Sequence, residues 1–312
     1  MNGLRALWVD QVQLRDGLTK EHRIYYEPSR FDPRPKEEEP MRKVMSKDGT
    51  QIAFDRSGDG PPVILVDGAL SSRRASLNVE LAAELAPHFT VYTYDRRGRG
   101  DSGDTPPYAI EREVEDIEVL VEEAGGSAHL YGISSGGVLA LDAANRLGRK
   151  ITRLAVYEAP FVVDNTRAPL PDGYLARLKE LVASNRRSKA VDLFMGRGIG
   201  LPGWMILMMR FLPSRSAQKA LAHTLPHDAA IMGDTQSGNP LPTDRWTSIT
   251  APALIIAGGK SPVWMKNGQR ALADLLPIAQ HHTLEGQMHI VKAATLAPLL
   301  DEFFAAGHAT SR

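Results

Sequence analysis

The sequence predicts an α/β fold in which a mostly parallel, doubly wound sheet is covered by helices on both faces. Three observations predict it. Short apolar runs alternate with helix-like segments from residue 42 to 159 and again from 247 onward. The 312 residues are 43% hydrophobic and 24% charged, as in a globular protein. A G-x-S-x-G pentapeptide lies between a strand-like and a helix-like segment.

The predicted strands are short runs of apolar and β-branched residues bounded by Gly, Pro or charged residues. The first of them follows the Asp48–Gly49 turn, so we expect it at the edge of the sheet. The strands are residues 50–56, 63–66, 90–94, 128–131, 153–157, 253–257 and 281–284.

The predicted helices have apolar residues at helical spacing and end at breakers, which include Pro87, the pair Gly125–Gly126, and Gly148. In chain order they are residues 71–86, 110–124, 135–147, 265–276 and 291–305. Because parallel strands alternate with these helices, functional loops should lie at the carboxyl ends of the strands.

Two segments depart from the alternation. Residues 1–40 end in FDPRPKEEEP, a run of Pro and charge that cannot build a core, and we interpret them as an N-terminal extension and linker. Residues 160–246 mix helix formers with breakers and predict a helical cap inserted after the sixth strand. The α/β core should then comprise residues 41–159 and 247–312.

Composition excludes several classes of protein and site. The 37 basic and 37 acidic residues cancel, which argues against a nucleic-acid partner. With no cysteine there is no thiolate nucleophile, disulfide or cysteine-ligated metal. No phosphate-binding, dinucleotide-binding or H-E-x-x-H pattern occurs, so we expect no cofactor and no metal.

The sequence also bears on membranes and compartment. The first residues carry Asp10 and Asp16 and lack a long apolar run, so they do not resemble a signal peptide. The most apolar stretch, residues 201–212, contains Pro202 and Arg210 and is too short to span a bilayer. We expect a cytoplasmic protein without a membrane span, and its oligomeric state stays open.

Ser134 is the candidate nucleophile. It is the central residue of Gly132–Gly136, where a strand turns sharply into a helix and exposes the serine Oγ. Flanking glycines let strand and helix approach closely, and the helix N-terminus favours developing negative charge.

A serine hydroxyl needs a base, and His289 is the best placed of the nine histidines. It follows the predicted strand 281–284 through a short loop. His281 and His282 lie in the strand itself, and His223 and His227 lie in the insertion, so we expect packing or surface roles for these four.

Several motifs together resemble those of the α/β-hydrolase superfamily, in particular its serine esterases. The resemblance covers roughly residues 41–306. It implies a serine, acid and histidine in that order along the chain, and no cofactor. It also implies an oxyanion hole made by the N–H groups of Ser135 and Ala69, with Leu70 as the adjacent alternative. The motifs are VILVDG (63–68), YDRRGRGDS (94–102), YGISSGG (131–137), PALIIAGG (252–259) and GQMH (286–289).

Two positions depart from the family pattern. Asp67 stands where relatives often carry histidine before Gly68, and we interpret it as a carboxylate that caps the loop, although its role stays open. Ser261 stands where relatives usually carry the triad aspartate, and a serine cannot stabilise an imidazolium as a carboxylate does.

Glu158 is the best replacement for the missing acid. It follows the strand 153–157, and some dehalogenases and lipases of the family carry their acid there. The alternatives are Asp164, Asp234 and Glu285, or a Ser–His dyad without an acid.

The segment after the strand 90–94 carries Asp95 and three arginines, Arg96, Arg97 and Arg99. We expect a structural role, with Asp95 accepting from backbone amides and the arginines pairing with carboxylates such as Asp101. An anion-binding patch is the alternative.

These features predict a serine hydrolase that cleaves a carboxylic ester, thioester or lactone of a small, hydrophobic acyl substrate through an acyl-enzyme. The missing aspartate at Ser261 motivates an alternative, a ligand-binding protein with little or no catalysis. The family resemblance leaves open C–C bond hydrolysis and haloperoxidase-like chemistry.

Overall fold

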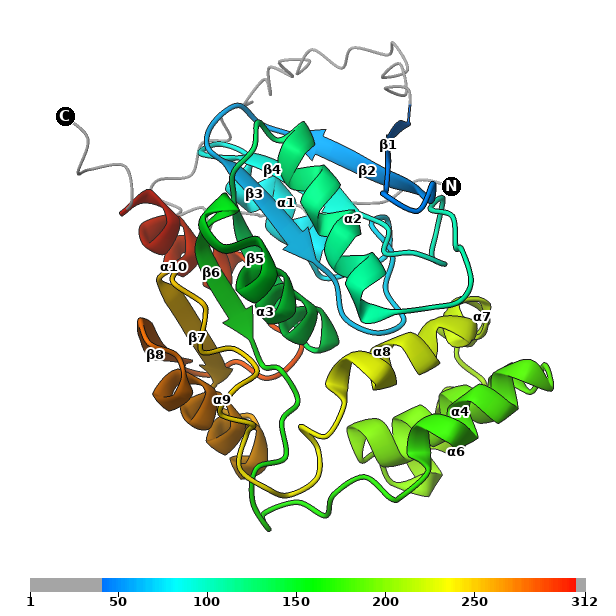
Figure 1. Cartoon of the computed structure of the whole chain (residues 1–312). Helices are drawn as coiled ribbons and strands as arrows, with labels where there is room; N and C mark the ends of the chain where they lie inside the picture. Colours follow the sequence, from blue (N-terminus) through cyan, green and yellow to red (C-terminus); the bar gives the residue numbers. More distant parts are fainter. Residues whose placement is uncertain (1–40, 307–312) are drawn as a thin grey trace, which may run out of the picture. The chain divides into compact units, whose positions relative to one another are not determined.

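An eight-stranded sheet forms the centre of residues 41–306, the part that this computed structural model describes (Figure 1). The predicted extension, residues 1–40, lies outside the described residues. The strand order is β1-β2-β4-β3-β5-β6-β7-β8. The pairs β1–β2 and β2–β4 are antiparallel and the remaining pairs are parallel. The predicted mostly parallel α/β fold is confirmed.

The central strands are short apolar runs because helices cover both of their faces. Every residue of β4, β5 and β7 is buried. The strands are β1 (Arg42–Met45), β2 (Gln51–Ser57), β3 (Pro62–Val66), β4 (Thr90–Tyr94), β5 (Ala128–Ile133), β6 (Ile151–Tyr157), β7 (Ala253–Gly258) and β8 (Ala279–Leu284).

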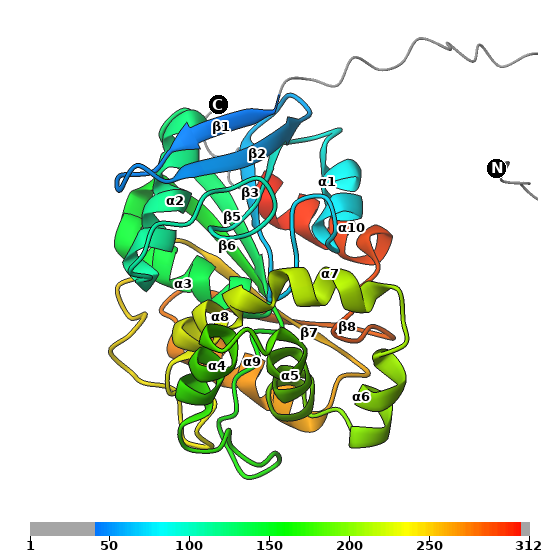
Figure 2. The ribbon, with the colours of Figure 1, turned by 90° about the vertical axis from the view of Figure 1, so that its right-hand side faces the viewer.

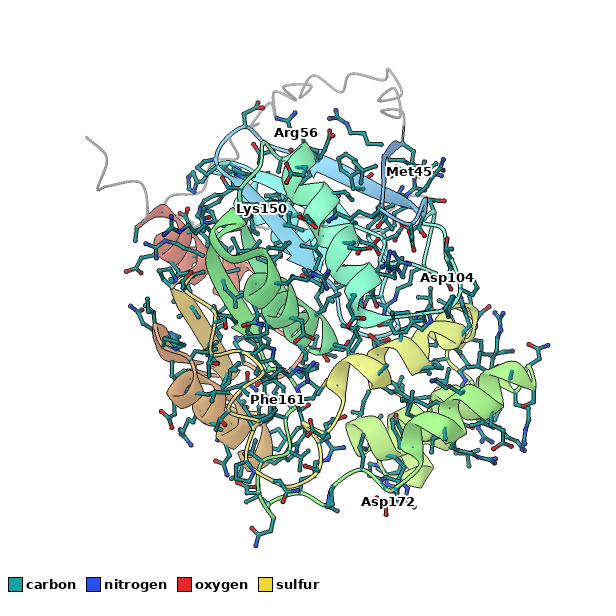
Figure 3. All side chains as sticks on the ribbon, in the orientation of Figure 1. Met45, Arg56, Asp104, Lys150, Phe161 and Asp172 are labelled. Carbon is teal, nitrogen blue, oxygen red and sulfur yellow. The ribbon has the colours of Figure 1, made fainter. Side chains whose placement is uncertain are left out.

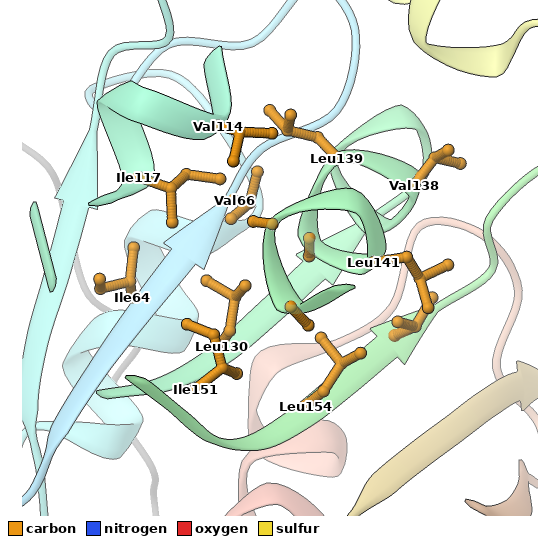
Figure 4. Close-up of a cluster of buried hydrophobic side chains, with 14 of the residues drawn as sticks. Ile64, Val66, Val114, Ile117, Leu130, Val138, Leu139, Leu141, Ile151 and Leu154 are labelled. Atoms are coloured by element: carbon orange, nitrogen blue, oxygen red, sulfur yellow. The ribbon is translucent and has the colours of Figure 1, made fainter. Parts of the chain in front are cut away.

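Helices cover the sheet in two layers, and each layer encloses one hydrophobic core (Figure 2). On one face lie α2 (Ile110–Glu123), α3 (Ser135–Leu147) and α9 (Val263–Leu275). On the other lie α1 (Asn78–Leu85) and α10 (Ala293–Ala305). Figure 4 shows the first core where α2 and α3 pack on β3, β5 and β6, with Ile117, Leu130 and Leu139 among its members.

Five α-helices lie between β6 and β7, within residues 160–246, which we call the helical insertion (Figure 1). A separate apolar cluster holds it together, with Leu178, Val191 and Leu225 fully buried. Figure 3 shows Phe161 near the end of β6 and Asp172 on the side of the insertion that faces away from the sheet. The helices are α4 (Tyr174–Ala183), α5 (Arg187–Leu193), α6 (Gly203–Met209), α7 (Ser214–Leu221) and α8 (Leu225–Met232).

None of the helices within residues 41–306 has both the length and the apolarity needed to cross a bilayer. The predicted apolar stretch 201–212 contains α6, which has seven residues.

Two local predictions are wrong. The helix expected at residues 71–86 begins only at Asn78. Long-range contacts hold the preceding residues as a loop, since the Arg73 N–H donates to Asp95 Oδ1 at 2.8 Å and its side chain pairs with the same carboxylate. The strand expected at the edge of the sheet, residues 50–56, corresponds to β2. It is the second strand of the sheet, because β1 pairs with its outer side.

Candidate active site

Ser134 occupies a sharp turn between β5 and α3. Its φ of 58° and ψ of −132° are rare for a residue with a side chain. A Cβ on Gly132 would lie 2.5 Å from the carbonyl oxygen of Gly136, and one on Gly136 would lie 2.5 Å from that of Asp67. The Ser134 N–H donates to the Tyr157 carbonyl of β6 at 3.0 Å. The two glycines are therefore required for strand, helix and neighbouring loop to meet at the serine.

Glu158 and His289 are hydrogen-bonded. His289 Nδ1 lies 3.0 Å from Glu158 Oε2, and the Gly258 N–H donates to Glu158 Oε1 at 2.7 Å. Glu158 is fully buried, directly after β6, with a φ of 46°. The Tyr157 hydroxyl donates to the Met288 carbonyl at 2.7 Å and so anchors the histidine loop. A carboxylate at Nδ1 keeps the proton on that nitrogen and leaves Nε2 free to act as a base.

The other candidate acids have different surroundings. Asp164 accepts from Thr166 and from Asn267. Asp234 and Glu285 are exposed. Within residues 41–306, His289 has no hydrogen bond to any of these three carboxylates. Ser261, in the position where relatives carry aspartate, is buried, and its Oγ has no hydrogen-bond partner in the described part of the chain.

Ser134, Glu158 and His289 all line one cavity of about 450 Å³. No hydrogen bond joins Ser134 to His289 among the described residues. Catalytic hydrogen bonds are often long in a ligand-free enzyme and shorten when substrate binds. The wall of the cavity is mostly apolar and comes from both the core and the insertion. Its apolar side chains include Leu70, Phe194, Met195, Leu225, Met232, Trp264, Met288 and Ile290.

The loop after β3 runs directly beside the nucleophile. A Cβ on Gly68 would lie 2.9 Å from Ser134 Cβ, so only glycine fits there. The following residue, Ala69, has an N–H with no acceptor within residues 41–306. Ser135 is the first residue of α3, and its N–H has no partner within the helix. Two unpaired donors therefore flank the serine, at the residues predicted for an oxyanion hole.

Backbone strain is concentrated around the same cavity. Among the described residues, four other than glycine have positive φ, and three of them, Leu70, Ser134 and Glu158, line the cavity. Such conformations cost about 1–3 kcal/mol each and are typically retained where function requires them.

Asp67 also lines the cavity, with a side chain that is nearly inaccessible. Its Oδ2 has no hydrogen-bond partner in the described part of the chain. Burial raises the pKa of Asp67 to about 7, although a hydrogen bond from Ser76 and the charges of Arg99 and Arg96 act in the opposite direction. The carboxyl group can therefore change its charge near neutral pH.

The segment after β4 is structural, as expected. Asp95 accepts from the backbone N–H groups of Arg73 and Asp101, at 2.8 and 3.0 Å. The expected pairing of the three arginines with carboxylates is confirmed. Asp101, the carboxylate named as an example, is not among their partners and pairs with Arg73 at 2.7 Å and with Arg74 at 3.9 Å.

The three arginines pair with buried carboxylates on helices. Arg97 pairs with Asp116 of α2, and Arg96 with Glu113 of the same helix. Arg96 and Arg99 both pair with Asp228 of α8, in the helical insertion. No sequence motif marks this aspartate as a functional residue.

Comparison with known proteins agrees with this fold. The model of the alpha/beta hydrolase family matches residues 63–310. The crystal structure of an alpha/beta hydrolase from Sphaerobacter thermophilus is 51% identical and covers 84% of this chain and 100% of that one, with a TM-score of 0.78. A thermophilic esterase from Thermogutta terrifontis is 20% identical, covers 86% of this chain and 99% of that one, and has a TM-score of 0.61.

An uncharacterized hydrolase of Bacillus subtilis is 34% identical over 98 residues. That match covers 30% of this chain and 35% of the relative, so it spans about a third of the relative's length. The family model covers most of this chain. The hydrolase from Sphaerobacter thermophilus is similar to this chain in both sequence and fold. This chain belongs to the alpha/beta hydrolase family.

Proposed function

We propose that the chain is a serine hydrolase that cleaves neutral carboxylic esters, thioesters or lactones. Ser134 is the nucleophile, His289 the general base and Glu158 the acid of the triad. The observation that carries the proposal is the 3.0 Å contact between His289 Nδ1 and a fully buried Glu158. The same histidine lines one cavity with Ser134, which is half-buried at its strained turn.

The chemistry follows from this arrangement. Ser134 Oγ attacks the carbonyl carbon of the substrate, and its proton passes to His289 Nε2. The carbonyl π electrons move to the oxygen, which becomes an oxyanion that accepts from the N–H groups of Ser135 and Ala69. When the intermediate collapses, the leaving alcohol or thiol takes the proton from His289. Water then cleaves the acyl-enzyme by the same steps, and Glu158 stabilises the imidazolium each time it forms.

The cavity supports a neutral, apolar acyl group. None of the described residues that line it is lysine or arginine, while Asp67, Glu158 and Asp228 contribute carboxylates. Asp228 is already paired with Arg96 and Arg99. A substrate with its own carboxylate would therefore lose its hydration in the cavity and find no cation in the lining to pair with. The insertion contributes much of the apolar wall, and we propose that it acts as a cap that excludes water from the reacting carbonyl.

A panel of p-nitrophenyl esters tests the proposal. We expect hydrolysis of acetate, butyrate, octanoate and dodecanoate esters, with the best kcat/KM at intermediate chain length, and far slower cleavage of the hemisuccinate, whose acyl group is anionic. Ser134→Ala should abolish these activities while Tm stays near that of the wild type, because the change removes one hydroxyl and leaves no large cavity. Full activity of Ser134→Ala, or preference for the anionic ester, would contradict the proposal.

A further inference from the structure

Asp228, on α8 of the helical insertion, is buried against the core loops that surround the nucleophile. Its side chain is 4% exposed. Its Oδ1 accepts from Arg96 Nη1 at 2.8 Å, from Arg99 Nη2 at 2.9 Å and from Ser135 Oγ at 2.8 Å, and its Oδ2 accepts from Arg99 Nη2 at 2.9 Å. One carboxylate of the insertion thus joins the segment after β4 to the first residue of α3.

The same two arginines also hold the loop beside Ser134. Arg99 Nη1 donates to the carbonyl oxygen of Gly68 at 2.5 Å, and Arg96 Nη1 donates to that of Asp67 at 3.2 Å. A peptide group is planar and trans, so the carbonyl of Gly68 and the N–H of Ala69 lie in one plane and point in opposite directions. A donor that holds the carbonyl therefore sets the direction of the N–H.

We propose that Asp228 is a positioning residue that orients the oxyanion hole. It holds Arg99 against the Gly68 carbonyl, which aims the Ala69 N–H, and it holds the side chain of Ser135, which supplies the second N–H. This inference rests on the proposed function. Asp228 acts through these groups and takes no proton from the substrate.

Two physical effects make the arrangement favourable for catalysis. A guanidinium that donates to a carbonyl polarises the peptide group, which makes its N–H a stronger donor. The carboxylate also neutralises two buried cations. Because Arg99 Nη2 donates to both oxygens of Asp228 while Nη1 donates to the Gly68 carbonyl, the planar guanidinium is held in one orientation. Burial by itself would raise the pKa of Asp228, but Arg99 and Arg96 hold that pKa below its ordinary value, so the group stays charged.

Asp228→Asn tests the inference, because the amide keeps the shape and removes the charge. With p-nitrophenyl butyrate at pH 8, we expect kcat to fall roughly 10- to 100-fold while KM changes little, less than the 10²–10³-fold cost of removing a donor entirely. Inhibition by 1,1,1-trifluorooctan-2-one should weaken by a similar factor. This ketone adds to Ser134 Oγ and forms a tetrahedral oxyanion, with the serine proton on His289, so its affinity reports on the hole.

Asp116→Asn is the matched control. Arg97 donates to Asp116 from Nε at 2.8 Å and from Nη2 at 2.7 Å, in a pair as buried as that of Asp228. Arg97 has no hydrogen bond to residues 67–69 among the described residues. Burial raises the pKa of Asp116 to about 6, so the carboxylate is charged at pH 8. The control should lose stability and keep both kcat and the affinity for the ketone.

A double variant, Arg99→Met with Asp228→Asn, keeps the test decisive if the single change impairs folding. It removes both charges of the Arg99–Asp228 pair, so that neither residue is left as a buried charge without its counter-ion. The double variant should lose as much kcat as we expect for Asp228→Asn alone. A folded Asp228 variant with kcat and ketone affinity within about twofold of the wild type would overturn the inference, and so would an equal loss in Asp116→Asn. A wild type that neither cleaves the ester nor binds the ketone would instead overturn the proposed function, and the inference with it.

Discussion

Glu158 is the acid of the proposed triad and follows β6, while the serine at the position after β7, Ser261, has no acidic group. Its Oε2 contacts His289 and its Oε1 accepts from Gly258, so both carboxylate oxygens have a partner. In Glu158→Gln the amide can still accept from Gly258, but its NH₂ group would face His289 Nδ1 and favour the wrong tautomer. We predict a loss of kcat of up to roughly 10⁴-fold, as when other triads lose this charge.

Ser261→Ala is the comparison for that variant on the same ester. Its hydroxyl is buried without a partner in the described part of the chain, so removing it should change kcat by less than a few-fold. Near-normal turnover of Glu158→Gln would show that Glu158 is structural and that the enzyme works as a dyad.

Asp67 should make stability depend on pH. Between about pH 4 and pH 7 this group is neutral in the folded protein and ionised in the unfolded chain, because burial raises its pKa to about 7. Ionising it in the fold therefore costs stability as pH rises through that window, and the cost is complete above it. The free energy of unfolding of Asp67→Asn, relative to the wild type, should rise by about 2–3 kcal/mol from pH 5 to pH 8.

Urea unfolding of both proteins at the two pH values measures this difference, and any pH-independent packing cost of the asparagine cancels. A relative stability that stays the same at pH 5 and pH 8 would show that Asp67 keeps one charge state across the range.

At the scale of the elements, the turn from β5 into α3 depends on glycine. A Cβ on Gly132 would collide with the backbone of Gly136, and backbone cannot move aside as a flexible side chain can. We predict that Gly132→Ala lowers the free energy of unfolding by about 3 kcal/mol or more. Gly203→Ala is the control, because a Cβ there meets nothing within 4 Å. Equal stability of the two variants in urea would contradict the close approach of strand and helix.

How far the sequence predicts an element depends on how local its determinants are. The turn at Ser134 and the helix that follows it are predictable because five adjacent residues specify them. Residues 71–77 are not, because Arg73 joins them to Asp95, which lies 22 residues further along the chain. The local pattern there is helical, and a buried ion pair overrides it.

Asp228 shows the same limit for the candidate site. Its partners Arg96, Arg99 and Ser135 lie 93 to 132 residues away, in the core, while it lies in an insertion without a recognisable motif. The one available signal was indirect. Three arginines in four residues, next to strands predicted to be buried, require carboxylates from elsewhere in the chain. Ser134, Glu158 and His289 were predictable because each follows a predicted strand, and strand ends meet at one edge.

At the scale of the whole molecule, every helix and strand that the structure describes lies between Arg42 and Ala305. The 51% identical hydrolase is matched over its full length by 84% of this chain. We therefore predict that a chain beginning at Met41 keeps the Tm and the kcat/KM of the full chain within about twofold. Thermal unfolding and ester hydrolysis of the two proteins measure this. A soluble but inactive shorter chain would show that residues 1–40 complete the site.

The central claim is that Ser134 is a nucleophile activated by His289 and Glu158. Mass spectrometry after treatment with a fluorophosphonate tests it most directly, because such probes phosphonylate an activated serine far faster than an ordinary hydroxyl group. We predict one adduct per chain, located by peptide mapping at Ser134, absent in Ser134→Ala and formed much more slowly in Glu158→Gln. An unlabelled wild type, or an adduct at a different residue, would contradict the claim.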